Sequence, residues 1–433
     1  MATRNEGRHT SVWLPFTQMK TLSELPRVKS GEGIMLELED GRQLMDCISS
    51  WWVTLHGHAQ PEIAEAISRQ ARTLEHVICA GLIHEPAEKL ADRLTGILPR
   101  GLEHVFYSDD GSTAVEVGLK MACQYWRNLG AGSKTRFLAF EGAYHGDTTG
   151  AMAVSHRSVF TDAFREMLFD VDFVPYPETF RGDPDPAAKE ERALAVLADY
   201  LEKYGDQYAA VIIEPLVQGA GGMRMCRPEF LAKLRQQVAA YDILIIFDEV
   251  MVGFGRTGEF FACLKSGVTP DIICLSKGIT GGFLPLAVTV CTETVYNAFY
   301  ADDPYKTLYH GHSYTANPLG CAAGLASLDL LEGRQEGFRN MEAWHREGME
   351  KLADHPLVEK LRICGTIAAM NIQDPSDSGY LSSYGPIIKK RFMEEGLLLR
   401  PLGNVLYILP PYCISKAQLD SVYSCIRDVL NEL

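Results

Sequence analysis

The chain has 433 residues, of which 46% are hydrophobic and 22% charged, and its formal net charge is −15. This composition is typical of a large globular protein with a buried core and more than one domain. The acidic balance and the lack of a basic block argue against nucleic acid or an anionic membrane surface as a partner.

Eleven cysteines are scattered from Cys47 to Cys425 without a CxxC spacing. This pattern predicts reduced, mostly buried thiols and argues against a disulfide framework or a zinc site. The start of the chain lacks the apolar segment of a secretory signal, and no apolar run approaches the roughly 18 residues of a membrane span. We therefore expect a cytoplasmic protein without a metal centre.

The first 60 residues follow neither a clear helical nor a clear strand period, and we expect segment 1–60 to pack with a smaller C-terminal domain. Residues 61–320 instead alternate strand-like apolar runs with helical patterns, which is typical of a large α/β domain with a mostly parallel, seven-stranded sheet. The predicted strands are 104–109, 136–140, 171–176, 209–215, 243–249, 271–277 and 286–292.

The last part of the chain, residues 321–433, has a different pattern. A helical period covers 338–363, strand-like pieces follow at 366–372 and 405–411, and a helix closes the chain at 415–433. This order predicts a smaller α+β domain.

Polar residues stand where several of the predicted strands end, and ligands of open α/β sheets bind at the carboxyl ends of strands. After the first strand, Gly111 and Ser112 open a predicted helix. The free N–H groups of a helix start form a site for an anion such as phosphate, although an ordinary helix cap explains the same residues.

Two further strands end at Asp248 and at Lys277. An acid and a lysine at one sheet edge can simply pair with each other. They are also the two groups that pyridoxal phosphate requires, because a carboxylate keeps the pyridine nitrogen protonated and a lysine amine binds the cofactor. The helix start at Gly111 would then hold the phosphate, and Tyr144 offers a ring to stack on the pyridine. Each of these features alone is weak evidence for the cofactor, but together, at successive strand ends and in this order, they form a specific signal.

Five segments carry a resemblance to a known family. They are Ser108–Ala122, Glu141–Ala151, Ile212–Met223, Ile245–Cys263 and Pro270–Ala287. With them, nearly the whole chain resembles the class-III, fold-type-I pyridoxal phosphate aminotransferases.

The resemblance implies roles for the residues that hold the cofactor. Lys277 would bind it covalently and shuttle the proton, and Asp248 would pair with the pyridine nitrogen. Gly111 and Ser112 would hold the phosphate, and Tyr144 would stack on the ring and contact substrate.

Other residues would bind substrate or come from a second subunit. Trp51 and Trp52 would line the substrate pocket, and Arg400 would bind a substrate carboxylate through its bidentate fork. Alone, the tryptophans would more readily be core aromatics and Arg400 a surface charge. Segment 310–313 resembles a loop that reaches in from the neighbouring subunit, where Gly311 would meet substrate while His312 and Ser313 approach the phosphate. The resemblance therefore implies a homodimer with its active site at the subunit interface.

Two positions depart from the common pattern. Phe16 stands where related aminotransferases often have a tyrosine, so a hydroxyl contact to substrate is missing. His312 and Ser313 replace a proline and a threonine, and Ser313 keeps a hydroxyl for the phosphate. The resemblance favours a long keto acid as the acceptor and S-adenosyl-L-methionine as the amino donor, with lysine as the other possible donor. The alternative is an aminotransferase for an ω-amino acid of the ornithine, 4-aminobutyrate or β-alanine type.

Overall fold

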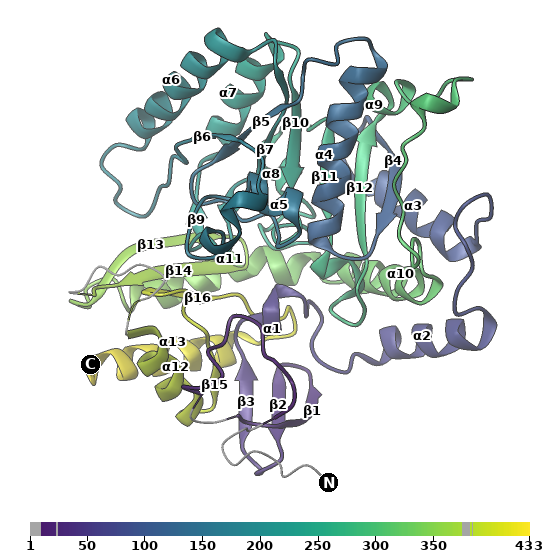
Figure 1. The fold of residues 1–433 in the computed structure, drawn as a ribbon. Coiled ribbons are helices and arrows are strands. Elements are labelled where there is room, and N and C mark those ends of the chain that lie inside the picture. The colour runs from purple at the N-terminus through teal and green to yellow at the C-terminus, as the bar shows by residue number, and fades with distance from the viewer. Residues whose placement is uncertain (1–9, 23–24, 375–381, 383) are drawn as a thin grey trace.

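The computed structural model describes residues 10–22, 25–374, 382 and 384–433, and its centre is a seven-stranded sheet (Figure 1). Six strands run parallel to one another, and β12 alone is antiparallel to both of its neighbours, β11 and β4. The predicted α/β class is therefore confirmed. In sheet order the strands are β4 (Leu102–Ser108), β12 (Ala287–Thr292), β11 (Ile272–Leu275), β10 (Leu244–Asp248), β7 (Tyr208–Ile213), β5 (Arg136–Phe140) and β6 (Asp172–Val174).

Helices cover both faces of this sheet, which explains why its strands are nearly continuous apolar runs. On one face, α4 (Gly111–Asn128) and α5 (Thr149–Val154) pack into a single apolar cluster with the sheet. On the other face, α3 (Glu85–Ile97), α6 (Pro186–Tyr204) and α7 (Pro228–Ala239) pack into the main core. Residues 244–248 of the central strand β10 are consequently all buried.

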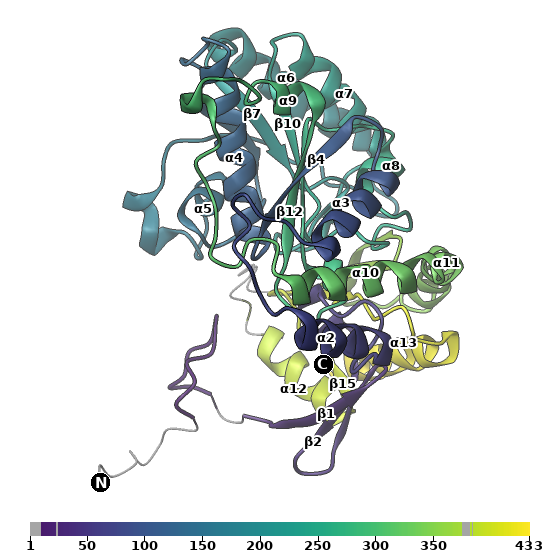
Figure 2. The same cartoon turned by 90° about the vertical axis from the view of Figure 1, so that its right-hand side faces the viewer.

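The N-terminal strands and the C-terminal part of the chain form a second body below this sheet (Figures 1 and 2). Two smaller sheets lie here, with orders β1-β2-β3-β15 and β13-β14-β16. Strand β15 pairs in parallel with β3, so residues near 45 and near 397 lie side by side. The domain boundaries at residues 60 and 320 stay a prediction, and segment 1–60 includes 1–9 and 23–24, which lie outside the described residues. The strands here are β1 (Val28–Glu32), β2 (Met35–Leu38), β3 (Gln43–Asp46), β13 (Val358–Cys364), β14 (Ile367–Ile372), β15 (Leu397–Leu398) and β16 (Val405–Ile408).

The other helices connect the two bodies or flank them. They are α1 (Ser49–Trp52), α2 (Pro61–Thr73), α8 (Ala262–Ser266), α9 (Glu293–Asn297), α10 (Pro318–Glu332), α11 (Gln335–Glu350), α12 (Tyr384–Glu394) and α13 (Lys416–Asn431), with short 3-10 turns at η1 (Asp162–Met167), η2 (Lys277–Thr280) and η3 (Pro304–Lys306) and a small hairpin of β8 (Val217–Gln218) and β9 (Arg224–Met225).

One predicted helix is wrong over its second half. The helix expected over 338–363 ends at Glu350, and residues Val358–Cys364 form strand β13. Pro356 lies between the two elements, and proline disfavours helix both at its own position and at the residue before it. The charged residues of this stretch suit a helix in isolation, but pairing with β14 decides their conformation.

All eleven cysteines are free thiols, and seven of them are buried. Among the described residues, no helix is long and apolar enough to cross a membrane.

Candidate active site

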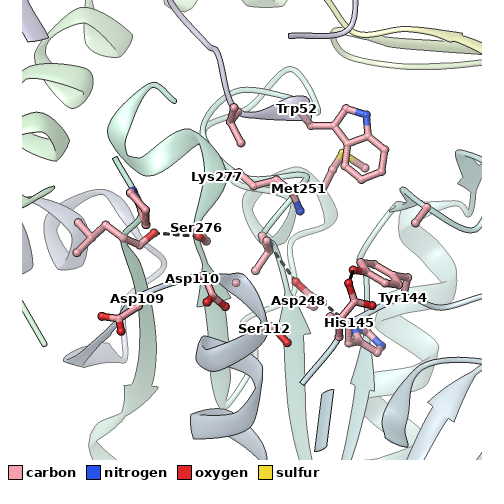
Figure 3. Close-up of a pocket in the computed structure, with 18 of the residues that line it drawn as sticks. Trp52, Asp109, Asp110, Ser112, Tyr144, His145, Asp248, Met251, Ser276 and Lys277 are labelled. Carbon is pink, nitrogen blue, oxygen red and sulfur yellow. Dashed lines mark hydrogen bonds and ion pairs between the residues drawn. The ribbon is translucent and has the colours of Figure 1, made fainter. Parts of the chain in front are cut away.

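A cavity of about 680 Å³ lies at the carboxyl ends of the sheet strands, beside α1 (Figure 3). Its lining comes from many separate parts of the chain, including the start of α4, the loop after β5, and the ends of β7, β10 and β11. Six of the residues predicted for the site meet there: Trp52, Gly111, Ser112, Tyr144, Asp248 and Lys277.

Lys277 opens η2, one residue beyond Ser276 after β11, and lines the cavity. Its backbone has φ of +44°, an unusual value for a residue other than glycine, and such backbone strain gathers at functional sites. The Nζ atom lies 5.3 Å from the ring centre of Trp52. Burial lowers the pKa of Lys277, while the charges of Asp248 and Glu214 oppose that shift. A lysine amine with a lowered pKa is a better nucleophile and base.

Asp248 lies almost wholly buried at the end of β10, and its partner is a residue that the sequence did not single out. The Nδ1 atom of His145 lies 2.7 Å from Asp248 Oδ2, and the N–H of Val250 donates to Oδ1 at 3.0 Å. The ion pairs between described residues do not include Lys277 with Asp248, so the simple alternative of mutual pairing is wrong. His145 is the residue after Tyr144, and this neighbourhood is the sequence signal that could have placed it in the site.

The start of α4 borders the cavity where the sequence predicts an anion site. Asp110 caps the helix by accepting from the N–H of Thr113, while Gly111 and Ser112 line the cavity. The Ser112 hydroxyl lies 2.7 Å from the hydroxyl of Thr148, which also donates its backbone N–H to Ser112. Two hydroxyls and a helix N-terminus at one point suit a phosphate group.

Tyr144 forms one wall of the cavity and is held at both ends. Its hydroxyl donates to Asp147 at 2.9 Å, and its backbone N–H donates to Glu214 at 3.0 Å. Glu214 also accepts from the N–H of Gly219, and burial raises the pKa of this carboxyl to about 7. Burial and the nearby Asp147 raise the pKa of Tyr144, so its phenol stays protonated at neutral pH.

These residues fit pyridoxal phosphate as a set. One cavity is bordered by the helix N-terminus at Gly111, the carboxylate of Asp248 and the amine of Lys277. These groups suit the phosphate, the pyridine nitrogen and the aldehyde of that cofactor, respectively. The buried Nε2 atom of His145 and hydroxyl of Ser108 also lack a protein partner in the described structure.

Gly282, in the loop after Lys277, lines the cavity and has a φ of +92°. A Cβ at this position would lie 3.0 Å from the backbone of Val53. The glycine therefore lets the loop pack against the segment that carries Trp52.

Three predicted substrate residues lie outside this cavity, where Arg400 and Phe16 each contact Trp51. The guanidinium carbon of Arg400 lies 4.7 Å from the ring centre of Trp51, and Phe16 meets the same ring edge-on at 5.8 Å. Trp51 is 41% exposed, whereas Trp52 is 4% exposed and lines the cavity. The paired tryptophans thus face different surroundings, since Ser50 and Trp52 have positive φ values that turn the chain sharply.

The predicted loop residues Gly311, His312 and Ser313 also lie outside the cavity of their own chain. His312 contacts His310 at 3.1 Å, and His310 contacts Lys120 at 2.9 Å. Gly311 and Ser313 are exposed. Their assignment to the active site of a neighbouring subunit stays a prediction.

A second buried carboxyl, Glu249, gives a testable pH dependence. It accepts the N–H groups of Ala262 and Cys263, and burial raises its pKa from 4.5 to about 7. The folded protein therefore keeps a proton that the unfolded chain has released between these values, so the free energy of unfolding falls as pH rises from 4.5 to about 7. We expect Glu249→Gln to flatten that decline by up to about 1.4 kcal/mol per pH unit.

Urea-unfolding midpoints measured across this pH range check the prediction. Glu259→Gln is the matched control, because that carboxyl is exposed and paired with Arg339. An unchanged slope in Glu249→Gln would show that the carboxyl is ionised throughout.

Comparison of the sequence with known proteins identifies the family of the chain. The model of the aminotransferase class-III family matches residues 19–430, and the chain belongs to this family. It is 56% identical, over 98% of its length and 99% of the relative, to the adenosylmethionine-8-amino-7-oxononanoate aminotransferase of Synechococcus elongatus. The enzyme of that name from Geobacter sulfurreducens is 44% identical over 96% of this chain and 94% of its own.

Solved structures lead to the same family. The adenosylmethionine-8-amino-7-oxononanoate aminotransferase of Methanocaldococcus jannaschii superposes with a TM-score of 0.90 at 32% identity, covering 98% of this chain and 97% of that one. A PLP-bound amine transaminase from an uncultivated Pseudomonas species has a TM-score of 0.92 at 28% identity, covering 99% and 100%. The chain is thus a pyridoxal phosphate-dependent aminotransferase.

Proposed function

We propose that this protein transfers an amino group to 8-amino-7-oxononanoate, giving 7,8-diaminononanoate for biotin biosynthesis, with S-adenosyl-L-methionine as the amino donor. The observation that carries the proposal is the 56% identity, over nearly the full length of both chains, to an enzyme named for these two substrates. The cavity around Lys277 and Asp248 supports the same reaction class. Lysine remains the alternative donor.

Separate residues of the chain would bind the cofactor and adjust its charge. Pyridoxal phosphate, when bound, withdraws electrons from the substrate carbon that loses a proton. Asp248, oriented by His145 and the N–H of Val250, would hold positive charge on the ring nitrogen. Gly111 and Ser112 would bind the phosphate, and Tyr144 would press against the ring.

Lys277 would move the proton. Its Nζ atom would accept the proton that leaves the donor carbon and would then release it on the cofactor side of the transferred nitrogen. The lowered pKa of this amine suits the task, because a base must be unprotonated to accept. The ring of Trp52 beside Nζ excludes water from one side of the amine. The same movements in reverse would serve the keto acid, so both half-reactions share one site.

The working form would be a homodimer with Gly311, His312 and Ser313 reaching into the partner's site. Exposed tyrosines near this loop in the sequence support the proposal, because aromatic side chains are enriched at protein interfaces. Tyr300, Tyr305, Tyr309 and Tyr314 are 76%, 88%, 71% and 63% exposed, respectively.

A donor assay tests the proposed function. Holoenzyme is mixed with S-adenosyl-L-methionine, lysine or 4-aminobutyrate without an acceptor, and loss of the absorption of the lysine-bound cofactor is followed. We expect conversion with S-adenosyl-L-methionine, and diaminononanoate once the keto acid is added. Conversion by 4-aminobutyrate alone would overturn the proposal in favour of an ω-amino acid aminotransferase.

Arg400 gives a separate prediction for the acceptor. Arg400→Ala should raise the KM for the keto acid roughly ten- to a hundredfold with a smaller change in kcat, because a charge-assisted pair with a carboxylate contributes about 1.5–3 kcal/mol. Steady-state kinetics at saturating donor measure both constants. Arg427→Ala, on the closing helix, is a control that should leave them unchanged. An unaltered KM in the Arg400 variant would remove this assignment.

A further inference from the structure

The turn that carries Lys277 has an unusual backbone. Lys277 has a φ of +44°, and such a conformation persists in a folded protein only where surrounding contacts hold it. Within η2, the N–H of Gly281 donates to the carbonyl oxygen of Gly278 at 2.9 Å. The N–H of Ile279 donates to that of Ser276 at 3.1 Å. Both bonds lie inside the turn, so they do not fix its position relative to the rest of the site.

The glycines of this turn pack it against residues 53–56, which follow α1. A Cβ on Gly278 would lie 2.9 Å from the side chain of Leu55, and a Cβ on Gly281 would lie 3.1 Å from the ring of His56. Both distances are shorter than an ordinary van der Waals contact between carbon atoms. The turn therefore lies directly on this segment.

Two buried side chains, His56 and Ser327, join the segment to the turn. The Nε2 atom of His56 lies 3.1 Å from the hydroxyl of Ser327, and that hydroxyl donates to the carbonyl oxygen of Gly278 at 3.3 Å. His56 is 0% exposed, and Ser327, on α10, is 2% exposed. This chain of hydrogen bonds, here called the relay, ends on the residue directly after Lys277.

The single hydroxyl proton of Ser327 sets the direction of the relay. Because this proton goes to Gly278, the ring of His56 is the donor to Ser327, which assigns the ring hydrogen to Nε2. The Nδ1 atom, which then lacks a hydrogen, has no partner among the described residues. Burial, helped by the charge of Arg334, lowers the pKa of His56 to about 3, so the ring is neutral near pH 7.

We propose that His56 and Ser327 are positioning residues for Lys277. Their relay holds the strained turn at the Gly278 carbonyl, so that the lysine amine stays beside the ring of Trp52 (Figure 3). Neither side chain lines the catalytic cavity, so both act through the turn and not on substrate. The effect on proton transfer rests on the role proposed above for Lys277, but it does not depend on which substrates the enzyme uses.

Ser327→Ala removes the hydroxyl and leaves the residues of the cavity in place. We expect the half-reaction at saturating S-adenosyl-L-methionine to slow roughly ten- to a hundredfold with little change in the half-saturating concentration, because small displacements of a reacting group have effects of this size. Stopped-flow absorbance measures this rate.

A pH titration of the same holoenzyme needs no substrate. The pH midpoint of the absorption of the lysine-bound cofactor should shift in Ser327→Ala by roughly half a unit or more, the size expected for one lost hydrogen bond. This readout tests the relay even where the proposed donor is wrong.

Two amide substitutions at His56 test the direction of the relay. Glutamine can place a side-chain N–H where Nε2 lies, whereas asparagine is one bond shorter and reaches only the position of Nδ1. His56→Gln should therefore keep the half-reaction within about threefold of the wild-type rate, and His56→Asn should slow it as much as Ser327→Ala does. Equal losses in the two amide variants would overturn the proposal.

Tyr423→Phe is the matched control, because it also removes a hydroxyl bound to a buried histidine. The Tyr423 hydroxyl lies 2.7 Å from Nδ1 of His345, between α11 and α13, and neither residue lines the cavity. Urea-unfolding midpoints should fall in this variant and in Ser327→Ala, but Tyr423→Phe should keep the wild-type rate and absorption.

A Ser327→Ala enzyme with the wild-type rate and absorption would overturn the proposal. So would losses that Tyr423→Phe reproduces, because they would come from lowered stability alone. Borohydride labelling at residue 277 in each variant shows that such a failure concerns the relay and not the assignment of Lys277.

Discussion

Lys277→Ala is expected to fold normally and to lose turnover by roughly 10⁴-fold or more, because the substitution removes both a nucleophile and an acid–base group. The lysine side chain contacts the face of Trp52 and leaves the Asp248–His145 pair untouched, so its removal breaks no ion pair of the described structure. Turnover at saturating pyridoxal phosphate and circular dichroism measure the two expectations.

Covalent labelling sharpens the test. Borohydride reduction of the holoenzyme followed by peptide mass analysis should place the cofactor on residue 277, and the label should vanish in Lys277→Ala. Added small amines should restore part of the turnover in that variant, since they can accept a proton in the vacated space. Lys351→Ala is the matched control, being an exposed lysine with a single acidic partner. A labelled, fully active Lys277→Ala enzyme would show that another lysine does the chemistry.

The sheet could be predicted because its strands are defined by local sequence. Strand β10 and its neighbour β11 are short apolar runs bounded by polar residues, and the segments predicted at 243–249 and 271–277 enclose the observed bounds. Parallel strands bring their carboxyl ends to one edge, so Asp248 and Lys277 were expected to lie near each other, and both line the same cavity.

Contacts between distant segments could not be predicted in this way. The pairing of His145 with Asp248 joins residues 103 positions apart, and periodicity carries no information on which side chain meets which. A second cavity of about 330 Å³, on the other side of Tyr144, likewise combines residues from β9, β13 and the loops after β5 and before β16. The prediction of helix at 358–364 was wrong for the same reason, because pairing with the neighbouring strand β14 decides the conformation of this charged segment.

Asp248→Asn tests the electrostatic core of the site. The substitution keeps the size of the side chain and an oxygen for the N–H of Val250, but it removes the charge that would hold a proton on the cofactor ring. We expect kcat to fall by roughly 10²- to 10³-fold, the range for loss of one preorganised electrostatic partner, with the phosphate site intact. Single-turnover rates at saturating cofactor measure the loss, and cofactor affinity is measured separately.

His145→Gln should produce a smaller loss, because His145 acts by orienting Asp248 and stabilising its charge at 2.7 Å. The double variant should then lose less than the sum of the two single losses, in free energy, since one residue acts through the other. The pH dependence of the half-reaction is a second readout that a purely structural role would leave unchanged. Strict additivity of the two losses would separate the residues and leave His145 as a packing residue of the loop after β5.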